Sequence, residues 1–589
     1  MKFLGNVLAS IIGLFVFFML LFFGILIFSA IAGSGSEVTQ VKSDSVIELD
    51  MKNISLDYTG KFTDPWVMLM NEEASVGFIE VLNALEAAKT DDDIKGISIL
   101  NSSSSLGLAQ SKALRDKLND FKKSGKFIVS YADAFSQKEY YINSVADTIY
   151  LNPVGEMDFK GLSTEVMFFK DIQEKSGVKL EVIRHGKYKS AVEPFLENEM
   201  SDANREQLSA LLNSAWSSIV TDIAASRKIS VDTLNSIANQ LAARTPEMAL
   251  SRKLIDKIGY EDQYHNGIRK ALKVEKDKEY NQVNIADYAK KIAQTPQKSD
   301  SNNKIAIIYA QGEIQGGEGD VNIIGEGAMR TALQEARKDD KVKAIVIRVD
   351  SPGGSALTSE LIWREIEITK KTKPIVVSMG NLAASGGYYI ACNADKIIAE
   401  PSTITGSIGV FGVLPNMTEL SNRIGISTSQ VATHNHSAGY SPFLPLDDKF
   451  KEVTTESVEN IYSTFVNRVA IGRKMTVEQV DAVAQGRVWT GTEALKNGLV
   501  DKLGGLDLAL KEAATLAKIK DFKTQNYPEF DKSFFDFISD QSSLPFTKSK
   551  ETMIKEELGV EAYQAYQLIK KLTAHQGIQM LMPYTLKIQ

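Results

Sequence analysis

Cysteine and histidine are scarce in this chain of 589 residues, which contains one cysteine and five histidines. A single cysteine excludes internal disulfides and any metal site built from several cysteines. Cys392 lies in an apolar run, so we expect a buried structural thiol rather than a catalytic one. The net charge is only −7, and we therefore expect no nucleic-acid partner.

Charged residues are absent between Lys2 and Glu37, and the apolar stretch Val7–Ile31 fills most of this interval. As a helix it would be about 37 Å long, enough to cross a bilayer with some tilt. A cleaved signal peptide is the alternative, with a small-residue site at Ala30–Ala32, but its apolar region is normally about 7–15 residues long. We expect residues 1–36 to form an uncleaved anchor and tether, with Lys2 in the cytoplasm and the rest of the chain outside the cytoplasmic membrane.

Residues 93–195 resemble residues 341–443 at a constant offset of 248, without a gap. For example, Tyr140–Ile142 corresponds to Tyr388–Ile390. A repeat of this length indicates two tandem domains rather than a solenoid. The organisation that we expect is an anchor and tether at 1–36, a first domain at 45–275, a linker at 276–303, a second domain at 304–520 and a C-terminal extension at 521–589.

Each copy begins with a β-branched run, Asp93–Leu100 or Lys341–Val349, which predicts a strand. A helical segment and a second strand follow in both copies, and this order is typical of a βαβ unit. The sequence therefore predicts an α/β fold with a largely parallel sheet in each copy. Beyond Lys520 the pattern weakens; we expect a helix at Glu551–Thr573 but see no chemistry there.

Ser385 is the candidate nucleophile, because small residues flank it on both sides in a segment where a helix is expected to start. The amide of Gly386 would then point toward a substrate carbonyl, as an oxyanion hole requires. The alternative is a close-packed helix start at which the serine is only an N-cap. The segment is not a Gly-x-Ser-x-Gly elbow, because Ala383 occupies the first glycine position. At the corresponding position the first copy has Gln137.

Two adjacent glycines, Gly353 and Gly354, lie in the turn after the strand Ala344–Val349. Glycines at a strand-to-helix turn allow a tight bend and expose backbone amides. An ordinary βα turn is the alternative, and a phosphate loop is disfavoured because no Gly-Lys-Ser/Thr follows. The first copy has four serines there instead, so the difference between the copies favours a special function in the second.

A serine hydroxyl needs a base to remove its proton. Lys189 is the better candidate, because the small and apolar residues after it could provide the desolvation that lowers a lysine pKa from about 10.4. A solvated surface lysine is the alternative, with Lys187 as the obvious decoy. His434 and His436 in the second copy are the rival bases, although no motif connects either of them to Ser385.

Four motifs taken together resemble the signal peptide peptidase A family, in its long, duplicated bacterial form. They are Tyr188–Phe195 (YKSAVEPF), Ser351–Ser355 (SPGGS), Ala383–Tyr388 (AASGGY) and Thr405–Gly412 (TGSIGVFG). The resemblance runs from the N-terminal anchor to near the C-terminus in matching order. It implies a Ser-Lys serine endopeptidase whose tandem domains have the fold of Clp protease and crotonase.

The resemblance also implies the roles of individual residues. Ser385 would be the acylating nucleophile, Lys189 the general base, and Gly354 and Gly386 the oxyanion hole, while Ser407 is a candidate for orienting the lysine ammonium. Family members form homo-tetramers on the membrane and degrade cleaved signal peptides, with apolar or small residues at the cut. The resemblance therefore implies the bacterial inner membrane, with the catalytic domains on its periplasmic side. It implies no metal and no cofactor.

Two other functions fit parts of the pattern. A crotonase-type acyl-CoA enzyme would share the fold and the oxyanion hole, but the anchor and the pairing of Ser385 with Lys189 disfavour it. A non-catalytic membrane scaffold of the same fold is the other alternative, and the intact motifs argue against it. We therefore expect a site that lies between the two copies, with neither copy active alone.

Overall fold

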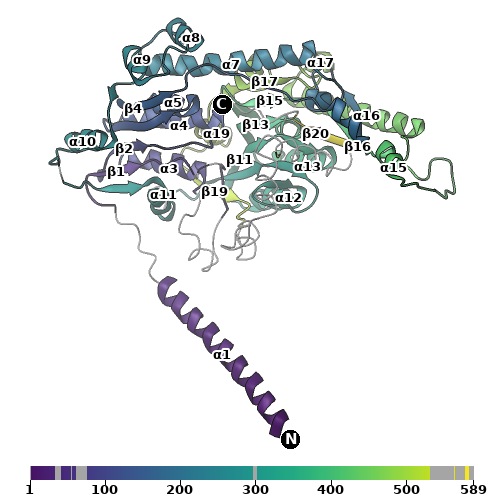
Figure 1. The fold of residues 1–589 in the computed structure, drawn as a ribbon, viewed down its shortest axis with the longest axis horizontal. Helices are drawn as coiled ribbons and strands as arrows, with labels where there is room; N and C mark the ends of the chain where they lie inside the picture. Colours follow the sequence, from purple (N-terminus) through teal and green to yellow (C-terminus); the bar gives the residue numbers. More distant parts are fainter. Residues whose placement is uncertain are drawn as a thin grey trace.

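The computed structural model describes residues 2–33, 41–52, 54, 56–60, 76–276, 278–295, 301–530, 563 and 578–582. Two largely parallel sheets and one mixed sheet form the body of the protein (Figure 1). The two largely parallel sheets repeat the same order of strands and helices, one for each copy of the duplicated sequence.

The sheet of the first copy has six strands, all parallel. In order across the sheet they are β6 (Lys257–Ile258), β4 (Thr148–Met157), β3 (Phe127–Phe135), β2 (Ile94–Leu100), β1 (Ser45–Glu48) and β7 (Gln282–Asn284).

The sheet of the second copy has eight strands, which are parallel except for the pairing of β15 with β17. Its path is β17 (Val488–Thr490), β15 (Ile404–Gly406), β13 (Ile375–Ala384), β11 (Val342–Ser351), β8 (Lys304–Gln311) and β19 (Lys523–Tyr527). Off this path, β14 (Lys396–Ala399) pairs with β13, and β18 (Lys502–Leu503) pairs with β14.

The mixed sheet joins segments that are far apart in the sequence. Its order is β10 (Ile323–Gly325), β9 (Glu313–Gln315), β12 (Gly353–Ser355), β20 (Ile578–Leu581), β16 (Val410–Asn416) and β5 (Lys179–His185). β5 comes from the first copy and β16 from the second, and they pair antiparallel over their full lengths. This pairing ties the first copy to the second.

Helices follow the strands in the same order in both copies. In the first copy they are α3 (Phe78–Ala88), α4 (Leu108–Lys122), α5 (Gln137–Asn143), α6 (Lys170–Ser176), α7 (Asp202–Arg227), α8 (Val231–Asn239), α9 (Pro246–Ser251), α10 (Glu261–Leu272) and α11 (Ile285–Gln294). In the second copy they are α12 (Glu326–Lys338), α13 (Ala356–Lys370), α14 (Gly386–Ala391), α15 (Thr418–Ile424), α16 (Asp448–Arg473), α17 (Val477–Val483), α18 (Gly491–Lys496) and α19 (Leu506–Leu516).

The hydrophobic core is shared between the two copies. Successive side chains of β11 point to opposite faces of its sheet, and both faces are buried because helices cover them. Ile345 packs in a cluster with Leu333 of α12. Val346, its neighbour in sequence, packs in the cluster that also contains Ile97 of β2 and Ala509 of α19. The two copies therefore share a common interior.

The fold predicted from the sequence is confirmed as α/β with a duplicated strand–helix–strand unit. β2, α4 and β3 in the first copy match β11, α13 and β13 in the second, and the strands of each pair are parallel. Ser355 caps α13 by accepting a hydrogen bond of 3.3 Å from the Thr358 amide. The helix expected near Gly386 is α14.

Some residues expected to be linker or extension belong to the sheets. β7 and α11 lie within 276–303, and β19 and β20 lie within 521–589. These strands are at most five residues long, and several carry polar residues, so they show no clear hydrophobic period. The helix expected at Glu551–Thr573 lies outside the described residues, except for Tyr563.

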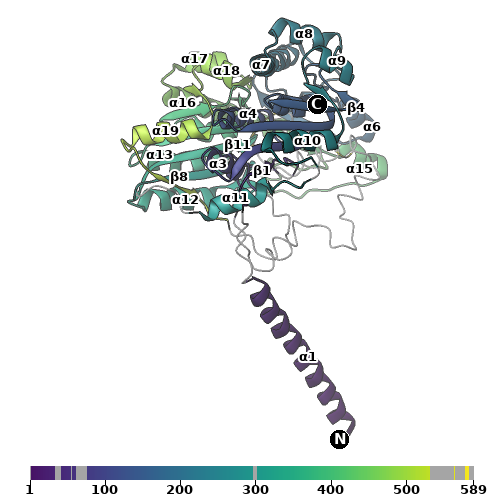
Figure 2. The same ribbon diagram turned by 90° about the vertical axis from the view of Figure 1, so that its left-hand side faces the viewer.

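The N-terminal helix α1 (Lys2–Gly33) lies apart from the sheets in both views (Figure 1, Figure 2). Among the residues whose side chains the structure describes, which in α1 are Gly5 and Ser10–Gly24, no helix has a stretch long and apolar enough to span a membrane.

Candidate active site

Ser385 lies at the tight connection between β13 and α14 and is fully buried. Its backbone has φ 55° and ψ −116°, a conformation that residues other than glycine rarely adopt. Its amide donates to the Gly406 carbonyl at 2.8 Å, and its carbonyl accepts the first hydrogen bond of the helix from Tyr389. Such strained positions cluster at functional sites, where the surrounding structure holds them.

Lys189 reaches Ser385 from the first copy of the repeat. Its Nζ lies 3.0 Å from Ser385 Oγ, 3.0 Å from Ser407 Oγ and 3.3 Å from the Ser407 carbonyl oxygen. Lys189, Ser385 and Ser407 are all fully buried. The structure thus brings together three of the residues predicted from the sequence, although Lys189 and Ser385 are 196 positions apart.

The environment of Lys189 favours a neutral amine. Burial lowers the pKa of its ammonium to about 7, because the charged form loses its hydration. Among the described residues, no carboxylate forms an ion pair with Lys189 that would raise the pKa again. A lysine with a pKa near 7 can accept a proton from a hydroxyl at neutral pH.

Two glycines of the second copy make room for Lys189, one beside its backbone and one beside its side chain. A Cβ on Gly486 would lie 2.6 Å from Lys189 Cβ and 2.7 Å from its amide nitrogen, and Gly486 has φ +78°. A Cβ on Gly409 would lie 3.2 Å from Lys189 Cδ. Gly486 was not among the residues predicted from the sequence, because nothing near it in the chain indicates that the Lys189 segment would pack there.

Hydrogen bonds fix the same segment on both sides of Lys189. The Tyr188 amide donates to the Gln485 carbonyl at 2.8 Å. Gln207 of α7 donates from Nε2 to Ser190 Oγ at 2.7 Å and to the Tyr188 carbonyl at 3.1 Å. Gln207 is a second residue that the sequence alone did not reveal.

The two predicted oxyanion-hole glycines are neighbours in space. A Cβ on Gly386 would lie 3.2 Å from the Gly354 amide nitrogen and 3.2 Å from the Gly353 Cα. Gly353 has φ +99°, and its amide donates to Ser351 Oγ at 3.1 Å, which holds the turn in place. Two backbone amides beside a serine hydroxyl can bind the oxyanion of a tetrahedral intermediate.

The described histidines make their contacts away from Ser385. His185 stacks on Tyr462, with 3.7 Å between the ring centroids. His434 and His436 are exposed and bond to residues of their own loop and of the start of α16. His575 lies outside the described residues.

Two further residues weighed in the sequence have different environments. Lys187 is exposed, and its Nζ lies over the Tyr188 ring, 5.0 Å from the centroid. Cys392 is fully buried, as predicted, and burial raises the pKa of its thiol to about 12.

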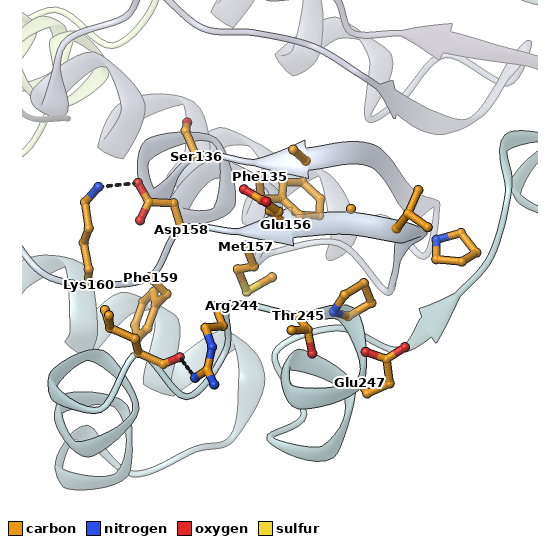
Figure 3. Close-up of a pocket in the computed structure, with 16 residues that line it drawn as sticks. Phe135, Ser136, Glu156, Met157, Asp158, Phe159, Lys160, Arg244, Thr245 and Glu247 are labelled. Carbon is orange, nitrogen blue, oxygen red and sulfur yellow. Dashed lines mark hydrogen bonds and ion pairs between the residues drawn. The ribbon is translucent and has the colours of Figure 1, made fainter.

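Gln137 occupies the position in the first copy that corresponds to Ser385. Its Oε1 accepts hydrogen bonds from the amides of Lys160 at 3.0 Å and Gly161 at 2.8 Å. Its Nε2 donates to the Gly161 carbonyl at 2.8 Å. The position is therefore filled by an amide that bonds to the backbone. Beside it lies an open groove of about 970 Å³, lined mainly by Pro153–Lys160 and the segment 244–247 (Figure 3).

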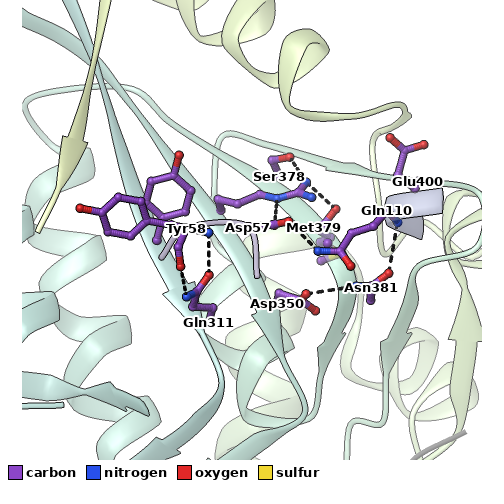
Figure 4. Close-up of polar contacts among 12 residues, drawn as sticks. Asp57, Tyr58, Gln110, Gln311, Asp350, Ser378, Met379, Asn381 and Glu400 are labelled. Carbon is purple, nitrogen blue, oxygen red and sulfur yellow. Dashed lines mark hydrogen bonds and ion pairs between the residues drawn. The ribbon is translucent and has the colours of Figure 1, made fainter. Parts of the chain in front are cut away.

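A buried charge cluster joins the two copies (Figure 4). Arg348 of β11 donates from Nε to Asp57 Oδ2 at 2.6 Å, and from Nη1 to Ser378 Oγ at 2.8 Å. Gln110 of α4 donates to the other Asp57 oxygen at 2.9 Å. The side chains of Asp57 and Arg348 are almost fully buried, so this ion pair has little screening by solvent.

Asp350 connects this cluster to the two site segments. It accepts the Leu382 amide at 2.8 Å and the Asn381 side-chain amide at 3.3 Å. Burial, together with the nearby Asp57 carboxylate, raises the Asp350 pKa to about 7. Asp350 thus holds the end of β13, just before Ser385, against the strand that leads into Gly353.

Comparison with known proteins identifies the family. The model of peptidase family S49 matches residues 120–275 and 367–520, more than half of the chain and once in each copy. The chain belongs to peptidase family S49. As an S49 peptidase it is a serine endopeptidase of the long form, with two S49 segments.

Relatives of this S49 peptidase come from several bacteria. Protease 4 of Salmonella typhi is 37% identical over 78% of this chain and 75% of its own length. Protease 4 of Haemophilus influenzae is 34% identical over 85% of this chain and 83% of its own length. A putative signal peptide peptidase SppA of Enterococcus faecium is 33% identical over 40% of this chain and 70% of its own length.

Proposed function

We propose that Ser385 is the nucleophile of this serine protease and that Lys189 is its general base. The observation that carries this proposal is the buried contact of 3.0 Å between Lys189 Nζ and Ser385 Oγ. The lysine pKa of about 7 supports it, because a base is most effective when its pKa is near the working pH. Ser407 accepts a second hydrogen bond from the lysine and so keeps Nζ aligned with the serine.

The reaction follows from these positions. The neutral Lys189 amine takes the Ser385 proton as Oγ attacks the peptide carbonyl, and the amides of Gly354 and Gly386 stabilise the oxyanion. The lysine ammonium then gives its proton to the leaving amine, and the acyl group remains on Ser385. Water, deprotonated by the same amine, hydrolyses this ester and frees the serine.

We propose cleaved signal peptides as the substrates, with apolar or small residues at the cut. The name of the Enterococcus relative supports this substrate class. The side chains around the site support an apolar peptide, because Val192, Phe195 and Phe411 form a buried cluster directly beside Lys189.

We also propose that α1 anchors the chain in the bacterial inner membrane, with the S49 segments on the periplasmic side. The sequence carries this proposal, through the uncharged run Val7–Ile31. The large apolar side chains between Ile11 and Phe23 are exposed, which supports burial in lipid.

The duplication supports a homo-oligomer in which neighbouring chains contact each other head to tail. The family resemblance implies that this oligomer is a tetramer. Within one chain, β5 of the first copy pairs with β16 of the second. At the offset of 248, β5 corresponds to residues 427–433 and β16 to residues 162–168, and neither of these described stretches pairs in a sheet. In an oligomer, residues 162–168 of one chain can pair with residues 427–433 of a neighbouring chain. This pairing would repeat the β5–β16 contact between chains.

The groove in the first copy supports the same arrangement. Thr490 of β17 is covered by α7, whose Ser214 bonds to it at 2.7 Å. Beyond the ungapped repeat the offset between the copies becomes 245, as Asp256–Gly259 and Asp501–Gly504 show, so Thr245 corresponds to Thr490. Thr245 lines the open groove (Figure 3). We expect α16 of a neighbouring chain to cover it, and Val431→Asp in the exposed stretch to lower the mass of the assembly in analytical ultracentrifugation. A wild-type protein that sediments as a single chain would contradict this proposal.

Two finer features of the organisation are also proposals. We propose that each S49 segment has the fold of Clp protease and crotonase, which the repeated strand–helix–strand units support. We propose domains at 45–275 and 304–520, which the element order of the two copies supports. A ClpP1 mutant from Listeria monocytogenes is 14% identical over 35% of this chain and 94% of its own length, with a TM-score of 0.24, and carries no argument for the fold.

Hydrolysis of an apolar peptide ester tests the dyad. Ser385→Ala and Lys189→Ala should each lower kcat by about 10³-fold or more, because each removes a group that acts in the same step. Lys187→Ala is the matched control, since Lys187 is an exposed lysine two residues away, and it should keep most of the activity. Robust turnover by Lys189→Ala would contradict the proposal and favour a histidine base.

A further inference from the structure

Another pocket lies between the two copies and has a volume of about 310 Å³. From the first copy, Leu82 of α3 and Lys117 of α4 line it. From the second copy, Leu508 of α19 lines it, together with Glu400 in the connection between β14 and β15. This volume is at the lower end of the range of small-molecule sites, so the pocket can hold one small ligand.

Glu400 is the buried acid of this pocket, with only 3% of the residue exposed. Within the described part of the chain, no donor is hydrogen-bonded to its carboxylate and no cation is ion-paired with it. Its backbone is fixed, because its amide donates to Thr403 Oγ1 at 3.0 Å. In Figure 4 the carboxylate points away from Asp57, and no hydrogen bond joins it to the residues drawn there.

Gly505, the residue before α19, leaves room for this carboxylate. A Cβ on Gly505 would lie 2.7 Å from Glu400 Oε1. The carboxylate therefore lies beside the N-terminal end of α19, where the helix dipole favours a negative charge. The dipole does not replace a counter-ion, because it corresponds to only about half of one elementary charge.

The charge of Glu400 is costly in this position. Burial raises the pKa of its carboxyl group to about 7, and the Asp116 carboxylate adds to the effect. The charged groups that face it from the surrounding elements are Lys112 and Asp116 of α4, Asp222 of α7, Arg348 of β11 and Asp507 of α19. Above about pH 7 the pocket therefore contains a buried negative charge without a cation bonded to it.

The other acids that line the pocket are bonded to lysines. They are Asp116, Asp120 and Asp507, whose partners are Lys112, Lys89 and Lys117 respectively. The unsatisfied carboxylate of the lining is therefore that of Glu400. A metal ion is disfavoured as its partner, since among the described residues no group of three histidines, cysteines or acids is placed to hold one.

Much of the remaining wall is apolar. It is formed by Ile79 and Leu82 of α3, Ile307 of β8, and Leu506 and Leu508 of α19. A buried carboxylate beside aliphatic side chains matches a ligand that has a cationic group and an apolar body. The cation would compensate the charge, and the body would displace water from the aliphatic wall.

We propose that this pocket binds a small organic cation, an ammonium or amidinium group attached to an apolar body, with the cation on the Glu400 carboxylate and the body between α3 and α19. The ligand contacts both copies and therefore strengthens their contact. The proposal is independent of the roles of Ser385 and Lys189, and it gives the chain a second site outside the candidate active site.

Isothermal titration calorimetry with phenethylamine tests this site in the full-length chain. A ligand of this size should bind with a Kd of about 1 mM or lower. Glu400→Gln keeps the shape of the side chain and removes its charge, and it should weaken binding about tenfold or more. Glu478→Gln, at an exposed glutamate of α17, is the matched control and should bind as wild type. Equal affinity in Glu400→Gln and wild type would overturn the proposal.

Matched ligands separate the two parts of the recognition. Phenethyl alcohol has the same body but no charge, and methylammonium has the charge but no apolar body. Each should bind the wild type at least about tenfold more weakly than phenethylamine. An alcohol that binds as well as the amine would overturn the proposal.

The pH dependence of binding identifies the carboxylate. Phenethylamine remains an ammonium between about pH 6 and about pH 8, whereas Glu400 loses its proton in this range. The affinity of the wild type should therefore rise about tenfold from about pH 6 to about pH 8, and that of Glu400→Gln should stay constant. A flat profile in the wild type would overturn the proposal.

Melting curves separate a binding role of Glu400 from a structural one. Glu400→Gln removes a buried charge that has no partner, so without ligand at about pH 8 it should melt no earlier than wild type. Phenethylamine should raise the Tm of the wild type and leave that of the variant unchanged. A variant that fails to fold, or that melts earlier than wild type, would show that Glu400 supports the fold and would overturn the proposal.

Discussion

At the scale of single residues, the proposed site depends on how completely Lys189 is desolvated. Lys189 has serine hydroxyls and a carbonyl around its Nζ, and none of these carries a charge. Desolvation therefore acts alone on its pKa. A carboxylate in the same place would favour the ammonium form and leave the serine without a base.

The pH dependence of the reaction should report this lysine. Its pKa is lowered to about 7, so the amine is protonated below that pH and neutral above it. We expect kcat/KM to rise about tenfold per pH unit below about pH 7 and to level off above it, as measured with the peptide ester from about pH 5 to about pH 9.

Asp350 provides the control for that profile, because its pKa is also raised to about 7. Asp350→Asn keeps an oxygen that can accept the Leu382 amide and removes the titration. The rising limb near pH 7 should persist in this variant. Its disappearance would assign the limb to Asp350 rather than to Lys189.

The position of the lysine should be as important as its pKa. Gly486→Ala places a methyl group within van der Waals overlap of the Lys189 backbone, at a φ of +78° that disfavours alanine. We expect kcat to fall by about 10²-fold, since a displacement of about 1 Å has this effect on a catalytic group. Gly316→Ala, whose Cβ would lie 3.8 Å from its nearest neighbour, should keep its activity. Equal activities in two folded variants would contradict the role of Gly486.

At the scale of elements, the strands that carry the site are held by groups far from the chemistry. β11 leads into the Gly353 turn and β13 leads into Ser385. Arg348 of β11 bonds to the Met379 carbonyl of β13 at 2.9 Å and to Asp57 of the first copy. The cluster therefore fixes the spacing of β11 and β13. It also holds the first copy against the second.

Removal of Asp57 should reveal how much this cluster contributes. Asp57→Ala leaves the buried Arg348 guanidinium without its counter-charge, and we expect the free energy of unfolding to fall by about 3–5 kcal/mol in urea titration. Asp44→Ala is the control, because its ion pair with Lys95 is exposed and should contribute less than about 1 kcal/mol. Similar losses in both variants would show that burial of the Asp57–Arg348 pair is unimportant.

At the scale of the whole molecule, the two copies have different tasks. The first copy supplies Lys189 and has Gln137 at its own serine position, where the side chain bonds to the backbone. The second copy supplies Ser385, and its residues 427–433 form an exposed loop where the first copy has β5. With the proposed dyad, one chain makes one site, across the contact of β5 with β16.

A mixing experiment tests whether the site is completed within one chain. Ser385→Ala and Lys189→Ala chains, co-expressed with different affinity tags and purified through both tags, should remain inactive on the peptide ester. A dyad shared between chains would instead form intact sites in the mixed assembly. Recovery of about a quarter of wild-type activity would contradict the intrachain dyad. A wild-type chain paired with a Ser385→Ala chain is the control and should keep about half the activity.

The sequence by itself determined what short stretches can specify. β-branched runs, the helical segments between them and the constant offset of 248 predicted two α/β copies, because strand and helix patterns depend on neighbours in the chain. The small residues around Ser385 indicated a tight turn for the same reason. Lys189 was a candidate from its neighbours, and only the family resemblance implied that it meets the serine.

Only the tertiary structure decided which distant segments meet. It brought Lys189 within 3.0 Å of Ser385, packed it against Gly486 and inserted β20 between β12 and β16. These contacts depend on backbone pairing and on space left by glycines, and neither has a periodic signature in the sequence. Strand edges pair with many sequences, so the sequence of residues 578–582 does not distinguish this segment from other short apolar runs. Only the fold shows that it lies between two strand edges.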